Sequence, residues 1–265
     1  METRRRVLNF DLNGTIIAHD STDTIPLESQ SNERISKSKT GHVVIEGDEF
    51  KWISCMETIK RVPIETLSYH AFVKKYYKES YEELSRTFTN KGNPGEKFRK
   101  QYLITLKYIM DTKIFPSFIN ALKTIGINDC VVLRTFGEDG IDVVERTNAF
   151  VAKSFVFGTL MYDEDDKVIL DMNGTIYSGH DEITNYFNTC KFNLCIRDSY
   201  SRWKNNSKKA EFGKPMFCHK EYDSYFFDDN PCVYPTYYSD NNGIYIVNTL
   251  DALFDNDYFT KKLMK

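Results

Sequence analysis

The feature that most constrains the fold is a short, largely apolar run, Val7 to Phe10, which ends at Asp11 and is followed by Asn13 and Gly14. Large apolar side chains over strand length predict a buried strand, and the Asn-Gly pair predicts a sharp bend after it. The strand therefore brings a carboxylate to its own carboxyl end. Ligands bind at that edge in open α/β sheets, so we expect Asp11 to belong to a functional site.

Two further apolar runs end in polar residues in the same way. The run that begins at Cys130 leads to Thr135, and the run 225–227 leads to the adjacent acids Asp228 and Asp229. Two like charges side by side are costly unless a cation or shifted pKa values relieve the repulsion. A divalent cation does so economically, and Mg²⁺ binds one or two carboxylates together with waters and phosphate oxygens. We therefore predict a magnesium site between these acids and the carboxylate of the first strand.

These segments resemble, in their order along the chain, the motifs of the haloacid dehalogenase (HAD) superfamily. Asp11 stands at the position of the attacking carboxylate in the strand-DxDGT motif, and Thr135 stands where a hydroxyl binds a phosphoryl oxygen. Asp228 and Asp229 resemble the acidic fourth motif. The resemblance covers the core of the chain and implies a phosphohydrolase fold and chemistry.

A lysine precedes the fourth motif in this superfamily and neutralises both the nucleophile and the transferred phosphoryl group. The resemblance makes Lys214, in the setting Gly-Lys-Pro, the best candidate for that position. Lys208 and Lys209 are its rivals, since they lie in a basic stretch just before it. The sequence leaves the choice among the three lysines open.

The resemblance implies in-line attack by Asp11 on a phosphoryl group, which gives an aspartyl-phosphate that water then hydrolyses. Asp11, Asp228 and the main-chain carbonyl of Asn13 would hold the magnesium ion, and Asp229 would support or complete its shell. The expected substrate is a phosphorylated small molecule, whose identity the motifs do not specify.

The sequence departs from the superfamily at Asn13. The phosphatases of the superfamily have an aspartate there, which protonates the leaving group and later activates water, and an amide does neither. General acid-base catalysis contributes about 10² to 10⁴ in rate, so we expect slow turnover by a phosphatase or phosphotransferase. The alternative is a catalytically impaired protein of this fold that binds magnesium and a phosphorylated ligand or partner.

The implied fold is a Rossmann-like three-layer α/β sandwich with a five-stranded parallel sheet in the order 5-4-1-2-3. Residues 1–17 and 114–265 would form this core, and residues 18–113 an inserted helical cap that excludes water and sets substrate choice. Apolar residues recur three or four apart over 64–88 and 98–110, which predicts helices, and the polar stretch 18–47 predicts an irregular segment. The five strands are expected near residues 6–11, 130–135, 192–197, 224–228 and 244–247.

The first motif has a near copy, in which Asp171 is followed by Met-Asn-Gly-Thr-Ile. Asn173-Gly174 lies between two alternating runs within 155–178, which is a strong signal for a β-hairpin. Because the first copy precedes the other motifs in family order, we assign the nucleophile to Asp11 and a turn to Asp171.

Composition excludes few functions. The net charge of −3 gives no sign of a dedicated nucleic-acid binder, although the basic stretch from Arg202 to Lys209, which includes Trp203, keeps that role as a weaker alternative. The six cysteines have no metal-site spacing, so free thiols in a cytoplasmic protein are expected. No stretch is apolar and long enough to span a bilayer, and we expect no membrane partner.

Overall fold

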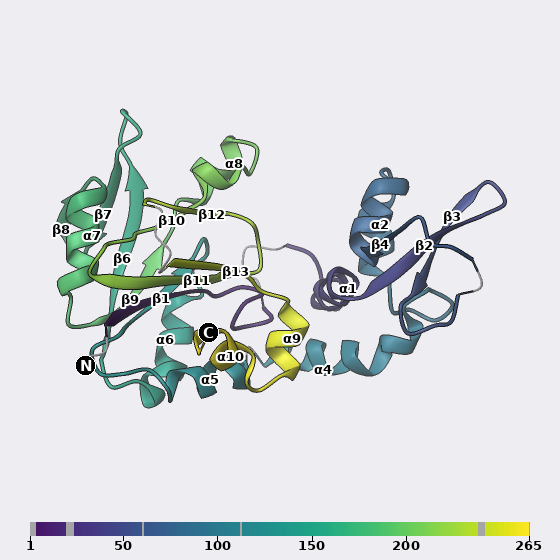
Figure 1. Cartoon of the computed structure of the whole chain (residues 1–265), viewed down its shortest axis with the longest axis horizontal. Coiled ribbons are helices and arrows are strands. Elements are labelled where there is room, and N and C mark those ends of the chain that lie inside the picture. The colour runs from purple at the N-terminus through teal and green to yellow at the C-terminus, as the bar shows by residue number, and fades with distance from the viewer. Residues whose placement is uncertain (1–3, 20–23, 60, 112, 238–241, 265) are drawn as a thin grey trace. The chain divides into compact units, whose positions relative to one another are not determined.

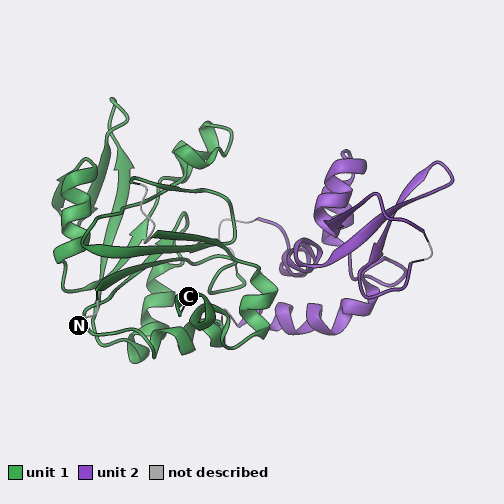
Figure 2. Ribbon diagram, in the orientation of Figure 1, with its two compact units in different colours: residues 1–23, 114–265 green, residues 24–113 purple. Residues whose placement is uncertain are grey.

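The computed structural model describes residues 4–19, 24–59, 61–111, 113–237 and 242–264 (Figure 1). The chain divides into two compact units, which Figure 2 colours separately. The first, here called the core, comprises residues 1–23 and 114–265, and the second, here called the insert, comprises residues 24–113.

The core is built on one large, mostly parallel sheet of eight strands. Their order across the sheet is β13-β11-β1-β5-β9-β6-β7-β8. The six strands from β13 to β6 are parallel, β7 is antiparallel to β6, and β8 is antiparallel to β7. The strands are β1 (Arg5–Asp11), β5 (Cys130–Thr135), β6 (Phe155–Tyr162), β7 (Val168–Met172), β8 (Thr175–Ser178), β9 (Asn193–Arg197), β11 (Tyr222–Asp228) and β13 (Asn242–Ile246).

The predicted five-stranded, all-parallel sheet is therefore too small. The strands expected near 244–247, 224–228, 6–11, 130–135 and 192–197 do stand side by side in the order 5-4-1-2-3, as β13, β11, β1, β5 and β9. The segment 155–178 was predicted as a hairpin, but its first strand also pairs with the open edge of β9 and so extends the sheet. An Asn-Gly signal fixes a turn and leaves open which sheet edge the hairpin joins.

β1 lies in the middle of this sheet because both of its faces are apolar. Phe10 stacks on Phe227 and meets the edges of Phe118 and Phe259 on one face. Val7 joins the buried cluster on the opposite face. With β11 on one side and β5 on the other, the carboxyl end of β1 stands between two other strand ends.

Helices cover both faces of the core sheet (Figure 1). One face packs against α5, α6, α9 and α10, and the other against α7 and a two-stranded ribbon of β10 and β12. The elements are α5 (Pro116–Leu122), α6 (Gly140–Thr147), α7 (His180–Thr189), α8 (Tyr200–Asn205), α9 (Thr249–Phe254), α10 (Tyr258–Leu263), β10 (Lys214–Met216) and β12 (Val233–Pro235).

The insert has helices within the predicted ranges 64–88 and 98–110, but it also has a sheet of its own. The prediction of an irregular stretch over 18–47 is wrong, since a helix and a strand lie within it. A three-stranded antiparallel sheet, β3-β2-β4, packs with four α-helices. The elements are α1 (Leu27–Ser38), β2 (Thr40–Glu46), β3 (Glu49–Ser54), β4 (Glu65–Ser68), α2 (Tyr69–Tyr76), α3 (Tyr81–Arg86) and α4 (Arg99–Met110).

The sequence pattern did not predict the strands of the insert, because these strands bury few side chains. In β3, for example, Trp52 and Ser54 are buried while the flanking residues are polar or half-exposed. Trp52 holds the sheet to the helices by packing edge-on against Tyr69 and Phe88. These contacts join residues distant in the sequence, so no local periodicity reports them.

In the part of the chain that the structure describes, no helix combines the length and the apolar character that crossing a bilayer requires.

Candidate functional site

Three carboxylates meet at the carboxyl ends of two neighbouring strands. Asp11 ends β1, and Asp228 ends β11 and is followed by Asp229. Asp11 and Asp228 are buried, and Asp229 is half-buried. Each of the three offers an oxygen, and these oxygens all lie within 4.8 Å of one another. The structure thus brings together the acids that the sequence predicted as metal ligands.

Lys214 lies against two of these acids. Its Nζ donates to Asp11 Oδ1, and it is 2.9 Å from Asp228 Oδ2. The side chain is only 2% exposed, and its ammonium also lies 4.7 Å from the centroid of the Phe136 ring. The structure therefore places Lys214 beside the acids that end β1 and β11.

The ribbon of β10 and β12 fixes Lys214 in this place. Lys214 is in register with Val233, and its main-chain N–H donates to Cys232. Gly213 passes so close that a Cβ there would overlap the carbonyl of Cys232. The other two candidate lysines, Lys208 and Lys209, are exposed, and neither takes part in these contacts.

Burial and charge act together on these groups. Burial raises the pKa of Asp11 well above its ordinary range; Lys214 opposes that shift, and Asp228 and Asp229 add to it. Burial works against the charged form of Lys214, but Asp11 and Asp228 outweigh it and raise the pKa of the lysine. Three carboxylates face one ammonium, so the cluster carries excess negative charge when all its acids are ionised.

The donor set suits a hard divalent cation. Carboxylate oxygens are the ligands that Mg²⁺ and Ca²⁺ prefer, and the excess negative charge is of the size that such an ion neutralises. Other bonds orient the ligands: the Asn230 N–H donates to Asp228 Oδ1 at 2.9 Å, and Thr15 Oγ1 donates to Asp11 Oδ2 at 3.2 Å. The residues present therefore fit a cation held by Asp11, Asp228 and Asp229.

Asn13 and Thr135 stand beside this cluster and bond to each other. Thr135 Oγ1 donates to Asn13 Oδ1 at 3.3 Å and accepts from the Gly137 N–H at 2.9 Å. The amide nitrogen of Asn13 donates both to the carbonyl of His19 at 3.0 Å and to Asp139 Oδ2 at 2.8 Å. An amide fits here because two acceptors require a donor, and a carboxylate would face two oxygen atoms. The side chain of Asn13 is thus committed to hydrogen bonds, so only its main-chain carbonyl remains for the predicted metal contact.

Sequence reasoning missed Asp139. The residue precedes α6, in the segment after β5, and is half-buried. A signal existed, since an acid four residues after the polar end of a strand lies at the ligand-binding edge of the sheet. Its contact with Asn13 spans 126 positions of the sequence, and no local pattern predicts such a pairing.

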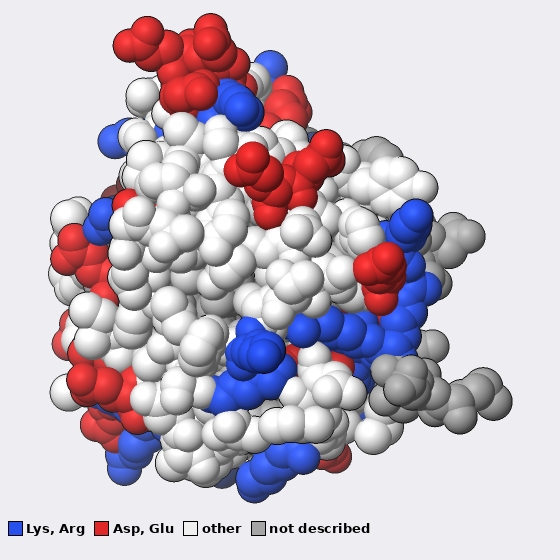
Figure 3. All heavy atoms as spheres, turned by 90° about the vertical axis from the view of Figure 1, so that its left-hand side faces the viewer, with Lys and Arg blue, Asp and Glu red and all other residues white. Residues whose placement is uncertain are grey.

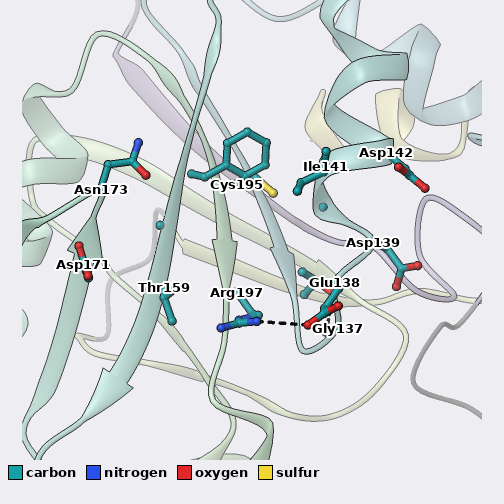
Figure 4. Close-up of a pocket in the computed structure, with 14 residues that line it drawn as sticks. Gly137, Glu138, Asp139, Ile141, Asp142, Thr159, Asp171, Asn173, Cys195 and Arg197 are labelled. Atoms are coloured by element: carbon teal, nitrogen blue, oxygen red, sulfur yellow. Dashed lines mark hydrogen bonds and ion pairs between the residues drawn. The ribbon is translucent and has the colours of Figure 1, made fainter.

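A cavity of about 720 Å³ opens next to these residues, at the carboxyl ends of β5 and β9 and beside the middle of β6 (Figure 4). Thr135 and Asp139 belong to its lining. Asp171 and Asn173 line the opposite side, and an ion pair of 3.7 Å between Glu138 and Arg197 lies between the two sides. The second copy of the motif therefore borders the cavity from a hairpin turn.

Comparisons of the chain with protein-family models, with curated proteins and with solved structures found no match. The functional argument consequently depends on the geometry of the site.

Proposed function

We propose that the protein is a magnesium-dependent phosphohydrolase of the HAD type, with a Rossmann-like three-layer core, which acts through an aspartyl-phosphate on Asp11. One observation carries the proposal. A single buried lysine contacts both the carboxylate that ends β1 and the carboxylate that ends β11. A buried arrangement of this kind is costly for stability alone, which favours a site for an anionic group and a cation over a structural ion pair.

Each residue then has a role in the reaction. Asp11 attacks the phosphorus atom in line with the leaving oxygen, and the bond to that oxygen breaks. Lys214 stabilises the charge on the phosphoryl oxygens, and Thr135 binds one of them. Bound Mg²⁺, held by Asp11, Asp228, Asp229 and the carbonyl of Asn13, would neutralise further charge on the transferred group. Water then releases phosphate from Asp11.

The substrate is a phosphorylated small molecule with a good leaving group. The amide of Asn13 has no proton to give to a departing alkoxide, and it is held by three hydrogen bonds. Turnover is therefore slow, and it is fastest for aryl and acyl phosphates, whose leaving groups are stable as anions. The cytoplasmic location of the protein stays a prediction from its free cysteines.

A nucleic-acid role has little support. Arg202 is engaged by Asp166, at 2.8 and 2.9 Å, and Trp203 stacks on Phe136. On the face of the core in Figure 3, basic and acidic side chains are both present and a broad uncharged area lies between them. Acidic side chains lie beside the basic ones on this face, which weakens its attraction for a phosphate backbone.

The test is hydrolysis of an aryl phosphate with Mg²⁺ and with EDTA. We expect magnesium-dependent release of phosphate that falls by about 10⁴ or more in Asp11→Asn, because the covalent route needs the carboxylate. The matched control is Asp171→Asn in the second motif copy, which should keep full activity. Binding of magnesium without any phosphate release would favour the alternative, a catalytically impaired binding protein.

A further inference from the structure

The hydrolysis of the aspartyl-phosphate needs a group that accepts a proton from water, and Asn13 cannot be that group. Its amide nitrogen already donates two hydrogen bonds, one of them to Asp139 Oδ2 at 2.8 Å. The carboxylate of Asp139 is therefore one hydrogen bond away from the side chain at which the superfamily pattern has its acid. It approaches the site from another segment of the chain, the one between β5 and α6.

The contacts of Asn13 orient its amide group relative to Asp139. Asn13 Oδ1 accepts from Thr135 Oγ1, so this end of the amide is oriented as an acceptor, and the nitrogen must face Asp139. The Asn13 amide therefore holds one oxygen of the Asp139 carboxylate in a fixed position beside residue 13.

Water has access to this carboxylate. Asp139 is half-buried and lines the cavity of about 720 Å³. Figure 4 shows Asp139 and Asp142 on the side of the cavity formed by the start of α6. Thr135, which bonds to the same amide, lines the cavity as well. Because Asp139 is half-buried, part of the residue is exposed to solvent.

We propose that Asp139 is the general base of the second half-reaction. The superfamily pattern has this base at position 13, and in this protein Asn13 instead holds Asp139 in place. The inference rests on the proposed function. Asp139 takes a proton from water, the resulting hydroxide oxygen forms a bond to phosphorus, and the bond between phosphorus and the Asp11 oxygen breaks. Asp11 leaves as a carboxylate, and the proton on Asp139 passes to solvent with the release of inorganic phosphate.

The experiment uses acetyl phosphate, an acyl phosphate that needs no acid to phosphorylate Asp11. We expect Asp139→Asn to form the phosphoryl-enzyme at the wild-type rate, seen as the mass gain of one phosphoryl group on the intact protein. The adduct should then persist, and steady-state release of phosphate should fall by about 10² or more. This split between a normal first step and a slow second step identifies a base.

Two further variants separate this role from a structural one. Asparagine at 139 keeps an oxygen that accepts from Asn13, so a structural role limited to that hydrogen bond predicts no change in thermal unfolding and none in dephosphorylation. The double variant Asn13→Asp/Asp139→Asn exchanges the amide and the carboxylate, and we expect it to regain at least about tenfold of the lost rate. Asp142→Asn, on the same side of the cavity, is the matched control and should hydrolyse its phosphoryl-enzyme like the wild type.

The outcomes for the two proposals are distinct. Turnover that is lost in Asp11→Asn but unchanged in Asp139→Asn overturns the assignment of the base and leaves the phosphohydrolase standing. A slow first step in Asp139→Asn, with no accumulation of adduct, also overturns it. Failure of the wild type to become phosphorylated, with no magnesium-dependent turnover, overturns both proposals.

Discussion

The two copies of the Asp-X-Asn-Gly-Thr-Ile sequence differ only in their second residue, Leu12 in one and Met172 in the other, yet the molecule uses them in different ways. The first copy continues the central strand β1 into the core and is buried along most of its length. The second forms the tip of the β7–β8 hairpin and is mostly exposed.

The backbones of the two copies diverge at the asparagine. Asn173 and Gly174 both have positive φ, +54° and +91°, as a tight hairpin turn of the primed kind requires. In the first copy only Gly14 has positive φ, at +83°, and its N–H donates to the carbonyl of Ile17. The same Asn-Gly pair therefore supports two different bends.

The partners of the two aspartates differ as well. Asp171 accepts from the N–H of Gly174 at 2.7 Å, a contact within its own turn. Asp11 accepts from Lys214, which is 203 positions away. The six residues of the motif thus specify a turn after an aspartate. Whether that aspartate belongs to a site depends on the strands that pack beside it.

The largest stability difference is expected at the isoleucines that close the two copies. Ile16 is fully buried, and its carbonyl accepts from the Phe115 N–H, whereas Ile176 is 55% exposed. Ile16→Ala should lower the free energy of unfolding by about 2 to 5 kcal/mol because it opens a cavity. Ile176→Ala should lower it by less than about 1 kcal/mol. Urea unfolding measures both, and equal losses would contradict the contrast drawn between the copies.

The asparagines give the next largest contrast. Asn13→Asp places a carboxylate against the carbonyl of His19 and the carboxylate of Asp139, so it should lower the free energy of unfolding by about 1 to 3 kcal/mol. Asn173→Asp keeps a residue that tolerates positive φ at an exposed turn and should change it by less than about 0.5 kcal/mol. If thermal unfolding shows that Asn13→Asp is as stable as the wild type, the two acceptors, the His19 carbonyl and Asp139, are not the reason for an amide at position 13.

The smallest expected effect on stability compares the aspartates of the two copies, Asp11 and Asp171. Mg²⁺ at roughly tenfold its dissociation constant should stabilise the wild type by about 1.4 kcal/mol relative to EDTA, because the ion binds only the folded state. Asp11→Asn should remove most of this shift, while Asp171→Asn should retain it. Differential scanning calorimetry compares the three proteins, and retention of the shift in Asp11→Asn would place the cation elsewhere.

Much of the candidate site could be predicted from the sequence. Asp11, Thr135 and Asp228 each end an apolar run of strand length, and such ends share one edge of a parallel sheet. Lys214 was one of three candidates, and only the pairing of β10 with β12 separated it from Lys208 and Lys209. The strands of the insert were not predicted, because their alternation is weak. The hairpin within 155–178 was predicted, but a turn signal does not state which sheet its strands join.

The sequence by itself determined the central strands and the acids at their carboxyl ends, because a buried strand needs a continuous apolar run and the polar residue that follows it must reach the surface or a site. The order of these strands was an implication of the resemblance. Tertiary structure alone decided which lysine lies against Asp11, and that Asn13 faces Asp139. Those outcomes depend on contacts between residues more than a hundred positions apart. The free energy of such contacts comes from burial and charge pairing in the folded chain, and no local pattern of residues contains it.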